Sequence, residues 1–398
     1  MNEKLSIAYA TRGQADDPGN WSGIVRHIKH GLIEAGHDVQ VIDGLSSAVP
    51  LLSRLRGRLV RAISGKTYAY DRDFGVSRHF ARQVENRLAD MEVDCVVCPV
   101  LPTAAQLRTK LPVAIWDDGP FHCLRQLYSQ YGGLAEDSLR QGDALDAVSI
   151  RKATLLAFAS QWAADDALNY HKADPAKTIV VPFGANCPSP FHDEAEAIAA
   201  LEAKPTSPLR LLFVGIDWER KGGPLTLDII QELRRRGVNA ELTIVGCNPF
   251  DGEPPKGVHC LGKLNKGNPA HAKQWQDCFR EAQLFIMPTR GECFGVVYAE
   301  AAAHALPSLG TRVGGVPDAI AEGVSGWLFD LEDGPAKYCD LLQSLAADPA
   351  RLREQGLLAF RHQKNVLNWD RSVEKFDSAL QSRMTSPTGA TQRTPAHT

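Results

Sequence analysis

Residues 4–43 read KLSIAYATRGQADDPGNWSGIVRHIKHGLIEAGHDVQVID and contain the pattern that decides the fold. The apolar run KLSIAYAT predicts a strand, and a polar loop follows it. The segment IVRHIKHGLIEAG shows apolar residues at helical spacing and stops at Gly36, after which HDVQVID predicts a second strand. A strand, a helix and a strand in this order form a right-handed βαβ unit with parallel strands.

Strand-like segments separated by helical segments recur along the first half of the chain. They are apolar almost throughout, which is typical of a parallel sheet that helices cover on both faces. The segments are VDCVVCPV, LPVAIWDD, ATLLAFAS and TIVVPFGA.

The composition changes at residues 193–208, DEAEAIAALEAKPTSP, which are first rich in Ala and Glu and then in Pro and Ser. We interpret this stretch as an interdomain linker, because the pattern restarts directly after it. The new set of strands reads PLRLLFVG, ELTIVG, GVHCLG, LFIMPT and LPSLGT. We therefore predict an α/β protein of two doubly wound domains, residues 1–195 and 205–367, with a ligand site in the cleft between them at the carboxyl ends of the strands. The polar tail, residues 385–398, is predicted to be disordered.

The bulk composition excludes several classes of protein. The net charge of −3 gives no reason to expect nucleic acid as a partner. No segment reaches the roughly 18 apolar residues of a membrane-spanning helix. The nine scattered cysteines indicate reduced thiols in a cytosolic protein. Cys95 and Cys98 form a CxxC inside a strand-like segment, so we expect them to pack in the core rather than to bind zinc or to react.

Two cations precede a predicted helix in the second domain. VGIDWERKGG places Arg220 and Lys221 in a loop that ends in glycines. The free N–H groups of a helix start, together with an Arg and a Lys, suit a diphosphate. The stretch is not a P-loop, because it lacks G-x-x-x-x-G-K-[ST]. The alternative is a pair of solvated cations at a helix cap.

Two glutamates bracket the apolar run FGVVYAEAAAHA, which predicts a helix. Glu292 lies just before this run and Glu300 lies inside it. At a rise of 1.5 Å per residue they would lie about 12 Å apart, too far to share a proton or a metal ion. That spacing suits hydroxyls at two places on one extended ligand. Gly295 would leave the helix start open to phosphate or sugar oxygens. The alternative is a surface helix with two solvated acids.

These motifs together resemble the GT-B glycosyltransferases of glycosyltransferase family 4, which are retaining enzymes that use nucleotide sugars. In the second domain the resemblance rests on the E-x7-E pair after MPTRGE, on GGVPD after the next strand and on GIDWERKGG. In the first domain it rests on WSG (21–23), IWDDGPF (115–121), SQWAADDAL (160–168) and VVPFGAN (180–186). It implies two Rossmann-like domains and a C-terminal helix, residues 368–383, that returns to the first domain.

The resemblance implies a role for each residue of the donor site. Glu300 would bind the ribose hydroxyls, and Glu292 would lie beside the transferred sugar. The backbone that contacts sugar hydroxyls and phosphate would come from Phe294, Gly295 and Val296.

The resemblance also assigns the charges around the diphosphate. Arg220 and Lys221 would neutralise the leaving group, and Gly23 would let the first-domain backbone approach the phosphates. Asp118 would lie near the reacting centre. Many relatives carry an arginine directly after the glycine of the phosphate strand, whereas this chain has Ile216 there.

The activity that the resemblance implies is transfer of a sugar, with retention, from a UDP-, GDP- or ADP-linked donor. The acceptor would be a glycan, a lipid-linked molecule or a small molecule, as in cell-envelope polysaccharide biosynthesis. No cofactor and no essential metal are expected, since the sequence shows no metal-ligand cluster. The alternatives are a nucleotide-sugar epimerase, a phosphorylase and a non-catalytic scaffold of the same fold. A nicotinamide dehydrogenase is disfavoured because the first loop lacks G-x-G-x-x-G.

One further segment indicates a peripheral contact with the inner face of a membrane. Residues 50–66, PLLSRLRGRLVRAISGK, interleave leucines with four arginines, Arg54, Arg56, Arg58 and Arg61. A basic amphipathic helix of this kind can lie on an anionic leaflet. The alternative is an ordinary surface helix or an acceptor-site loop.

Overall fold

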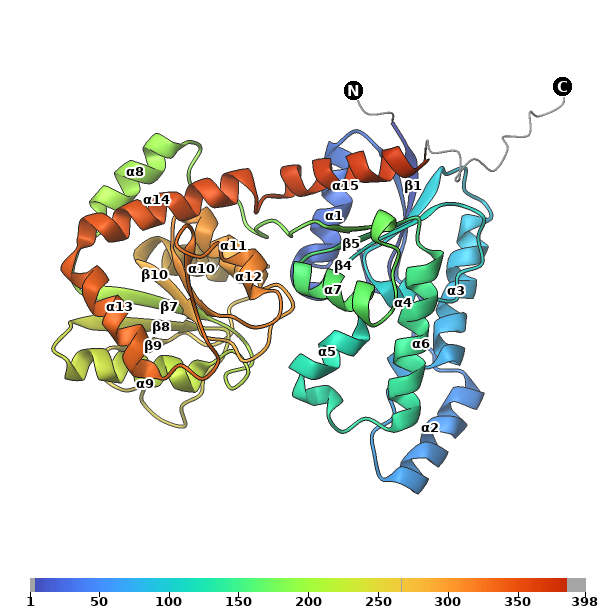
Figure 1. The fold of residues 1–398 in the computed structure, drawn as a ribbon, viewed down its shortest axis with the longest axis horizontal. Coiled ribbons are helices and arrows are strands. Elements are labelled where there is room, and N and C mark those ends of the chain that lie inside the picture. The colour runs from blue at the N-terminus through green and yellow to red at the C-terminus, as the bar shows by residue number, and fades with distance from the viewer. Residues whose placement is uncertain (1–3, 266, 385–398) are drawn as a thin grey trace. The chain divides into compact units, whose positions relative to one another are not determined.

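The computed structural model describes residues 4–265 and 267–384, which form two compact units (Figure 1). Unit 1 comprises residues up to Pro182 together with the helix that begins at Trp369. Unit 2 comprises Phe183–Asn368. Each unit is built around one parallel sheet with helices on its faces, as the repeated βαβ pattern predicts.

The described residues of unit 1 form a six-stranded sheet of order β2-β1-β3-β4-β5-β6. Its strands are β1 Ser6–Ala10, β2 Asp38–Ile42, β3 Cys95–Cys98, β4 Val113–Asp117, β5 Leu155–Phe158 and β6 Thr178–Val180. Ile7 lies opposite Val39 on one side and Cys95 on the other, and all the pairs are parallel. The central strands β3, β4 and β5 are buried along their whole length, because helices cover both faces of the sheet.

The helices of unit 1 connect and cover these strands. They are α1 Ile24–Glu34, α2 Leu51–Ser64, α3 Phe74–Leu88, α4 Leu101–Ala104, α5 Phe121–Leu127, α6 Glu136–Lys152, α7 Gln161–Asn169 and α15 Trp369–Met384, with short 3-10 turns η1 Asn20–Gly23, η2 Tyr70–Arg72, η3 Ser129–Tyr131 and η4 Pro175–Lys177.

The described residues of unit 2 form a second six-stranded sheet, of order β12-β11-β10-β7-β8-β9. Its strands are β7 Leu209–Val214, β8 Ala240–Val245, β9 Val258–Cys260, β10 Leu284–Met287, β11 Ser308–Thr311 and β12 Gly326–Phe329. Its helices are α8 Glu194–Ala203, α9 Gly223–Arg235, α10 Pro269–Glu281, α11 Val296–Ala303, α12 Val316–Ala319, α13 Pro335–Ala347 and α14 Pro349–Asn365. β12, which the sequence pattern did not predict, is a four-residue edge strand whose central residues are only half buried.

The predicted linker at residues 193–208 is mostly a helix of unit 2. Asp193 caps α8 by accepting a hydrogen bond from the N–H of Glu196. Ala197 and Leu201 are buried against Phe360 of α14. The boundary between the units therefore falls at residue 182, not at 195–205. Ala and Glu are strong helix formers, and composition alone does not say whether such a helix packs.

The C-terminal helix α15 lies on unit 1, where it packs against α1 and β5 (Figure 1). The ring of Phe376 stacks on Trp116 of β4 with centroids 4.9 Å apart. A Cβ atom at Gly31 of α1 would collide with Val373, so the two helices approach closely because that residue is a glycine. The chain thus returns to its first domain after completing the second.

The cysteines pack rather than pair. All nine lie within the described residues and are free thiols. Cys95 and Cys98 are fully buried on β3, which confirms their predicted place in the core. Burial raises the pKa of each of these two thiols to about 12. Residues 385–398, for which disorder was predicted, lie outside the described residues.

Candidate functional site

The site in unit 2 lies where the strand order reverses. β7 and β10 are neighbours in the sheet, but the chain leaves them in opposite directions, toward β8 and toward β11. Ligands of doubly wound sheets bind outside the carboxyl ends of the strands at such a point. The loops at these ends comprise residues 215–222 after β7, 288–295 after β10 and 312–315 after β11. They contain five of the second-domain site residues predicted from the sequence, and the other two, Val296 and Glu300, lie on α11, which begins directly after the second loop.

Main-chain hydrogen bonds hold these three loops to one another. The N–H of Arg290 donates to the carbonyl oxygen of Arg220 at 2.7 Å. The hydroxyl of Thr289 donates to the same oxygen at 3.1 Å. The N–H of Gly315 donates to the carbonyl oxygen of Glu292 at 3.0 Å. The site is therefore held in place by the backbone before any ligand binds.

The predicted acid and the two predicted cations form one cluster. The ammonium of Lys221 pairs with Oε2 of Glu292. Arg220 donates to the carbonyl oxygen of Gly291 at 2.7 Å and lies 3.5 Å from Oε2 of Glu292. Its Nε also lies 3.3 Å from a carboxylate oxygen of Asp217. The side chains of Lys221 and Glu292 are only 15% and 12% exposed, so this pair is largely withdrawn from water.

Helix α11 begins at the same place and carries the second glutamate. Gly295 precedes it with φ 85°, and no side chain caps the helix start. The N–H of Tyr298 donates to the carbonyl oxygen of Gly295 at 2.9 Å, and the positive end of the helix dipole at this start suits an anionic ligand. Phe294 is buried against the ring of Phe183, and Val296 is the first residue of the helix. Glu300 is 5% exposed, so the alternative of a surface helix with solvated acids is wrong.

Gly222, which the sequence analysis did not single out, lets the loops after β7 and β10 close on each other. Its φ is 79°, and a Cβ atom there would collide with the carbonyl oxygen of Pro288. The sequence feature that could have marked Gly222 is the pair of glycines directly after Lys221. Ile216, at the position where many relatives carry an arginine, is 73% exposed, which leaves Arg220 and Lys221 as the cations of this loop.

Unit 1 contains a polar cavity of about 220 Å³. It opens at the carboxyl ends of β1, β3 and β4, the equivalent edge of the other sheet. Its lining comprises Arg12, Trp21, Asp71, Arg72, Val100, Pro102, Asp117, Asp118, Gly119, Leu124 and Asp146. The predicted residue Asp118 lies here, and its Oδ2 accepts a hydrogen bond from the indole N–H of Trp21 at 3.1 Å.

The loop that contains Gly23 is strained. Trp21, Ser22 and Gly23 all have positive φ values, of 48°, 56° and 86°. This region is unfavourable for residues other than glycine, and such residues persist where surrounding contacts enforce them. The hydrogen bond from Trp21 to Asp118 is one such contact. The loop ends at the start of α1, so the predicted residue Gly23 lies next to an open helix start.

Buried charges surround the cavity, and the sequence analysis did not identify them. Burial raises the pKa of Asp146 to about 7, although Arg72, 3.9 Å away, and the hydrogen bond from the N–H of Phe121 both lower it. Burial, reinforced by the neighbouring Arg72, lowers the pKa of Arg12 to about 10. Arg12 lies two residues after β1, and a charged residue so close to a strand end could have marked it as a site residue. Asp146 lies in the middle of α6, where nothing local marks it.

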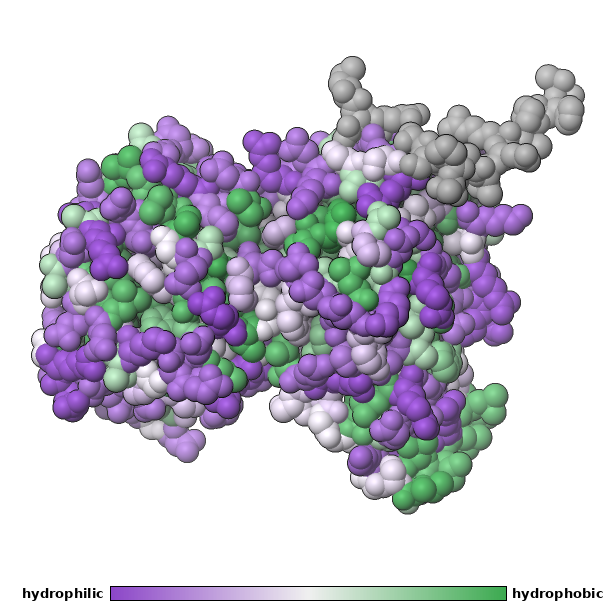
Figure 2. Space-filling view, in the orientation of Figure 1, coloured by the Kyte–Doolittle hydropathy of each residue, from purple (hydrophilic) through white to green (hydrophobic). Residues whose placement is uncertain are grey.

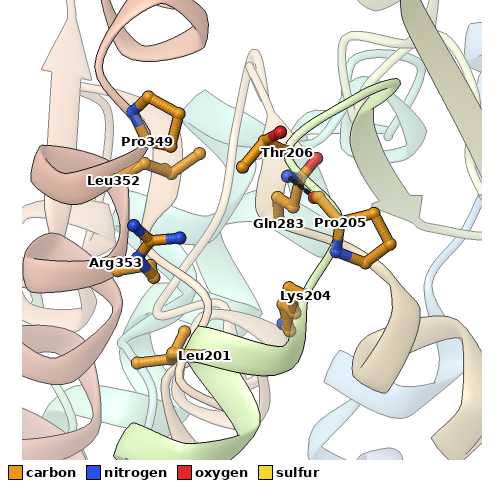
Figure 3. A pocket seen from close by; sticks show the side chains of 8 residues that line it. All are labelled: Leu201, Lys204, Pro205, Thr206, Gln283, Pro349, Leu352 and Arg353. Carbon is orange, nitrogen blue, oxygen red and sulfur yellow. Dashed lines mark hydrogen bonds between the residues drawn. The ribbon is translucent and has the colours of Figure 1, made fainter.

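A second hollow in unit 2, drawn in Figure 3, is not a candidate site. It has a volume of only about 20 Å³, close to the space that one water needs. Lys204 lies at its wall and donates to the carbonyl oxygen of Ala282 at 2.6 Å. Burial lowers the pKa of this lysine to about 8. The other side chains that line it are Leu201, Pro205, Thr206, Gln283, Pro349, Leu352 and Arg353.

Comparison with solved structures defines the class of fold. Sucrose-phosphate synthase from Thermosynechococcus elongatus is similar over 95% of this chain and 99% of its own, with a TM-score of 0.69 and 17% identity. The Anabaena protein HepE, solved in complex with UDP and glucose, is similar over 95% and 100%, with a TM-score of 0.60 and 15% identity. These likenesses show that the chain has the two-domain GT-B fold.

Comparison of sequences finds similarity to glycosyltransferases over part of the chain. Residues 208–348 match the model described as glycosyl transferases group 1. D-inositol 3-phosphate glycosyltransferase from Streptomyces avermitilis is 33% identical over 55% of this chain and 50% of its own. The same enzyme from Segniliparus rotundus is 31% identical over 52% and 47%. The chain thus spans about half the length of the curated relatives that it matches. The chain therefore has the GT-B fold, and its residues 208–348 are similar to the group 1 glycosyl transferases.

Proposed function

We propose that this protein is a retaining glycosyltransferase of family 4 that moves a sugar from a nucleoside diphosphate sugar to an acceptor hydroxyl. The observation that carries the proposal is the cluster of Arg220, Lys221 and Glu292 beside the uncapped start of α11. Two cations and a free helix start suit a diphosphate, and a buried carboxylate beside them suits a sugar hydroxyl. The names of the relatives agree with this activity.

The donor binds to unit 2 in this proposal. Glu300 accepts hydrogen bonds from the ribose hydroxyls, and Glu292 contacts the transferred sugar. The backbone of Phe294, Gly295 and Val296 approaches the sugar hydroxyls and the phosphate. Arg220 and Lys221 stabilise the negative charge that develops on the leaving diphosphate, and fixed cations in a partly dry site do so effectively.

The acceptor binds in the cavity of unit 1. Asp118 orients the acceptor hydroxyl, and Gly23 lets the backbone at the start of α1 approach the donor phosphates. In the transfer step the bond between the anomeric carbon and the phosphate oxygen breaks, and the acceptor oxygen bonds to that carbon on the same face. The acceptor proton passes to the leaving phosphate oxygen. No enzyme carboxylate becomes bonded to the sugar.

The finer parts of the assignment are predictions of the same proposal. Since two cations face the diphosphate, we expect sugar transfer to continue in the presence of EDTA. Free thiols at all nine cysteines are what a reducing compartment allows, so we place the protein in the cytoplasm. The donor is a UDP-, GDP- or ADP-linked sugar, and a role in cell-envelope polysaccharide biosynthesis stays a prediction.

The proposal is tested by incubating the purified protein with a panel of these donors and measuring release of nucleoside diphosphate with and without polyol, glycan and lipid-linked acceptors. We expect one donor to be turned over, and the anomeric configuration of the product to match that of the donor by NMR. Glu300→Ala should weaken nucleotide binding at least tenfold, because it removes charge-assisted hydrogen bonds. Glu281→Ala, which removes an exposed acid of α10, should not.

Three outcomes would contradict the proposal. Binding of nucleotides without any turnover would favour the non-catalytic scaffold. A change in the configuration of the sugar without transfer would favour the epimerase. Absence of nucleotide binding would remove the donor site altogether.

A further inference from the structure

Helix α2 of unit 1 packs with its polar side toward the protein. Ser53 and Gly57 are its buried residues. The hydroxyl of Ser53 donates to Oδ1 of Asp73 at 2.5 Å, and Gly57 lies against the phenol of Tyr70. An amphipathic helix of a globular protein normally turns its apolar side to the core. Here small and polar residues occupy that side.

The apolar side of α2 therefore faces outward. Its exposed large side chains are Leu51 at 71%, Leu52 at 79%, Leu55 at 50%, Leu59 at 60% and Ile63 at 78%. No other helix or strand in the described part of the chain exposes so many. Figure 2 shows a patch of hydrophobic residues at the place where Figure 1 draws α2. A contiguous exposed apolar patch on a folded protein marks an interaction surface.

The charges of α2 indicate what this surface meets. Arg54, Arg58 and Arg61 are exposed on the flank of the apolar face, and the helix contains no acidic residue. Arg56 differs from these three arginines, because its charge is already paired: it makes a bidentate ion pair with the carboxylate of Asp137 at 2.7 and 2.9 Å. Three unneutralised cations beside exposed leucines match a surface that is negatively charged above an apolar layer.

We propose that α2 docks this protein on an anionic lipid bilayer. The leucines and Ile63 enter the boundary between headgroups and acyl chains, and Arg54, Arg58 and Arg61 bind lipid phosphates. The helix lies in the plane of the interface; none of the described helices is long and apolar enough to cross a membrane. Pairing of α2 with a second copy is disfavoured, because α2 carries four arginines and no acidic residue, so two copies of the helix would repel each other.

The test is cosedimentation of the full chain with vesicles of phosphatidylcholine alone or mixed with phosphatidylglycerol. We expect binding to the mixed vesicles only, and at least tenfold weaker binding in high salt, since surface charges are screened. Arg54→Gln/Arg58→Gln/Arg61→Gln should weaken binding at least tenfold. Leu52→Ser/Leu59→Ser/Ile63→Ser should abolish it without lowering the melting temperature, since these side chains are exposed.

Matched controls change the same kinds of residue elsewhere. Arg235→Gln/Arg280→Gln/Arg371→Gln removes three arginines that are 75%, 65% and 63% exposed. Val324→Ser/Leu331→Ser removes two apolar side chains that are each 41% exposed. Both should bind vesicles like the unaltered protein. If the unaltered protein stays in the supernatant with anionic vesicles at low salt, the proposal is wrong. The proposal is also wrong if the protein does not bind vesicles and instead forms a dimer in analytical ultracentrifugation. In that case Leu52→Ser/Leu59→Ser/Ile63→Ser would convert the dimer to a monomer.

Discussion

At the scale of single residues, Lys221 and Glu292 form the ion pair at the centre of the proposed donor site. The two residues are 71 positions apart, and each is mostly buried. A buried charge without a partner is costly, so each residue holds the other in place. In the proposed function, a diphosphate therefore competes with Glu292 for the ammonium of Lys221.

This competition predicts that replacing Glu292 and replacing Glu300 change the affinity for nucleoside diphosphate in opposite directions. Glu292→Gln frees Lys221 for phosphate, so the affinity for free nucleoside diphosphate should rise by roughly tenfold, from one charge-assisted hydrogen bond. Sugar transfer should fall in the same variant, because the proposed function places Glu292 against the transferred sugar. Glu300→Gln should lower the nucleotide affinity by a similar factor. Calorimetric titration measures both affinities, and weaker nucleotide binding by Glu292→Gln would show that the carboxylate only positions Lys221.

Asp146 gives a prediction about pH. Burial raises its pKa from 3.8 to about 7 in the folded protein. Between these values the folded protein holds a proton that the unfolded chain releases. The stability that this proton contributes is therefore present in full below the unfolded pKa and is lost as the pH rises through the folded one, at about 1.4 kcal/mol per pH unit.

Denaturant unfolding of the unaltered protein and of Asp146→Asn, from pH 5 to pH 8, measures this effect. The free energy of unfolding of the unaltered protein, minus that of the variant, should fall as the pH rises and then level off. Other groups, such as His171, whose pKa is lowered to about 4 by burial, titrate alike in both proteins and cancel. A difference that does not change with pH would place the pKa of Asp146 in its ordinary range.

At the scale of elements, the close approach of the loops after β7 and β10 depends on Gly222. Gly222→Ala combines a positive φ with a collision against Pro288. Gly237→Ala is the matched control, since its φ is 83° and nothing lies within 4 Å of the added Cβ. We expect the control to lose about 1 kcal/mol of stability. Gly222→Ala should lose clearly more and also bind nucleoside diphosphate more weakly, as thermal unfolding with and without nucleotide would show. Equal losses in both variants would mean that the loops relax freely.

The elements also show what local pattern can and cannot predict. The βαβ repeats and all but one strand were predictable, because strand and helix periodicity depends on near neighbours in sequence. The role of α8 was not predictable, because an Ala/Glu-rich stretch has the same composition whether it links two domains or packs on Phe360. The sequence of α2 likewise predicts an amphipathic helix but not which side faces the protein.

At the scale of the whole molecule, the sequence by itself determined two doubly wound domains, the strand ends that carry the site residues, and the resemblance to a family. Each of these three features depends on patterns within about ten to forty neighbouring residues, which can be read from the sequence without knowing which distant residues meet. Only the tertiary structure decided that Lys221 meets Glu292, that Arg12, Arg72 and Asp146 share one cavity, and that α15 covers Trp116. The reason is physical: these contacts join residues far apart in sequence, and only packing of the folded chain brings such residues together.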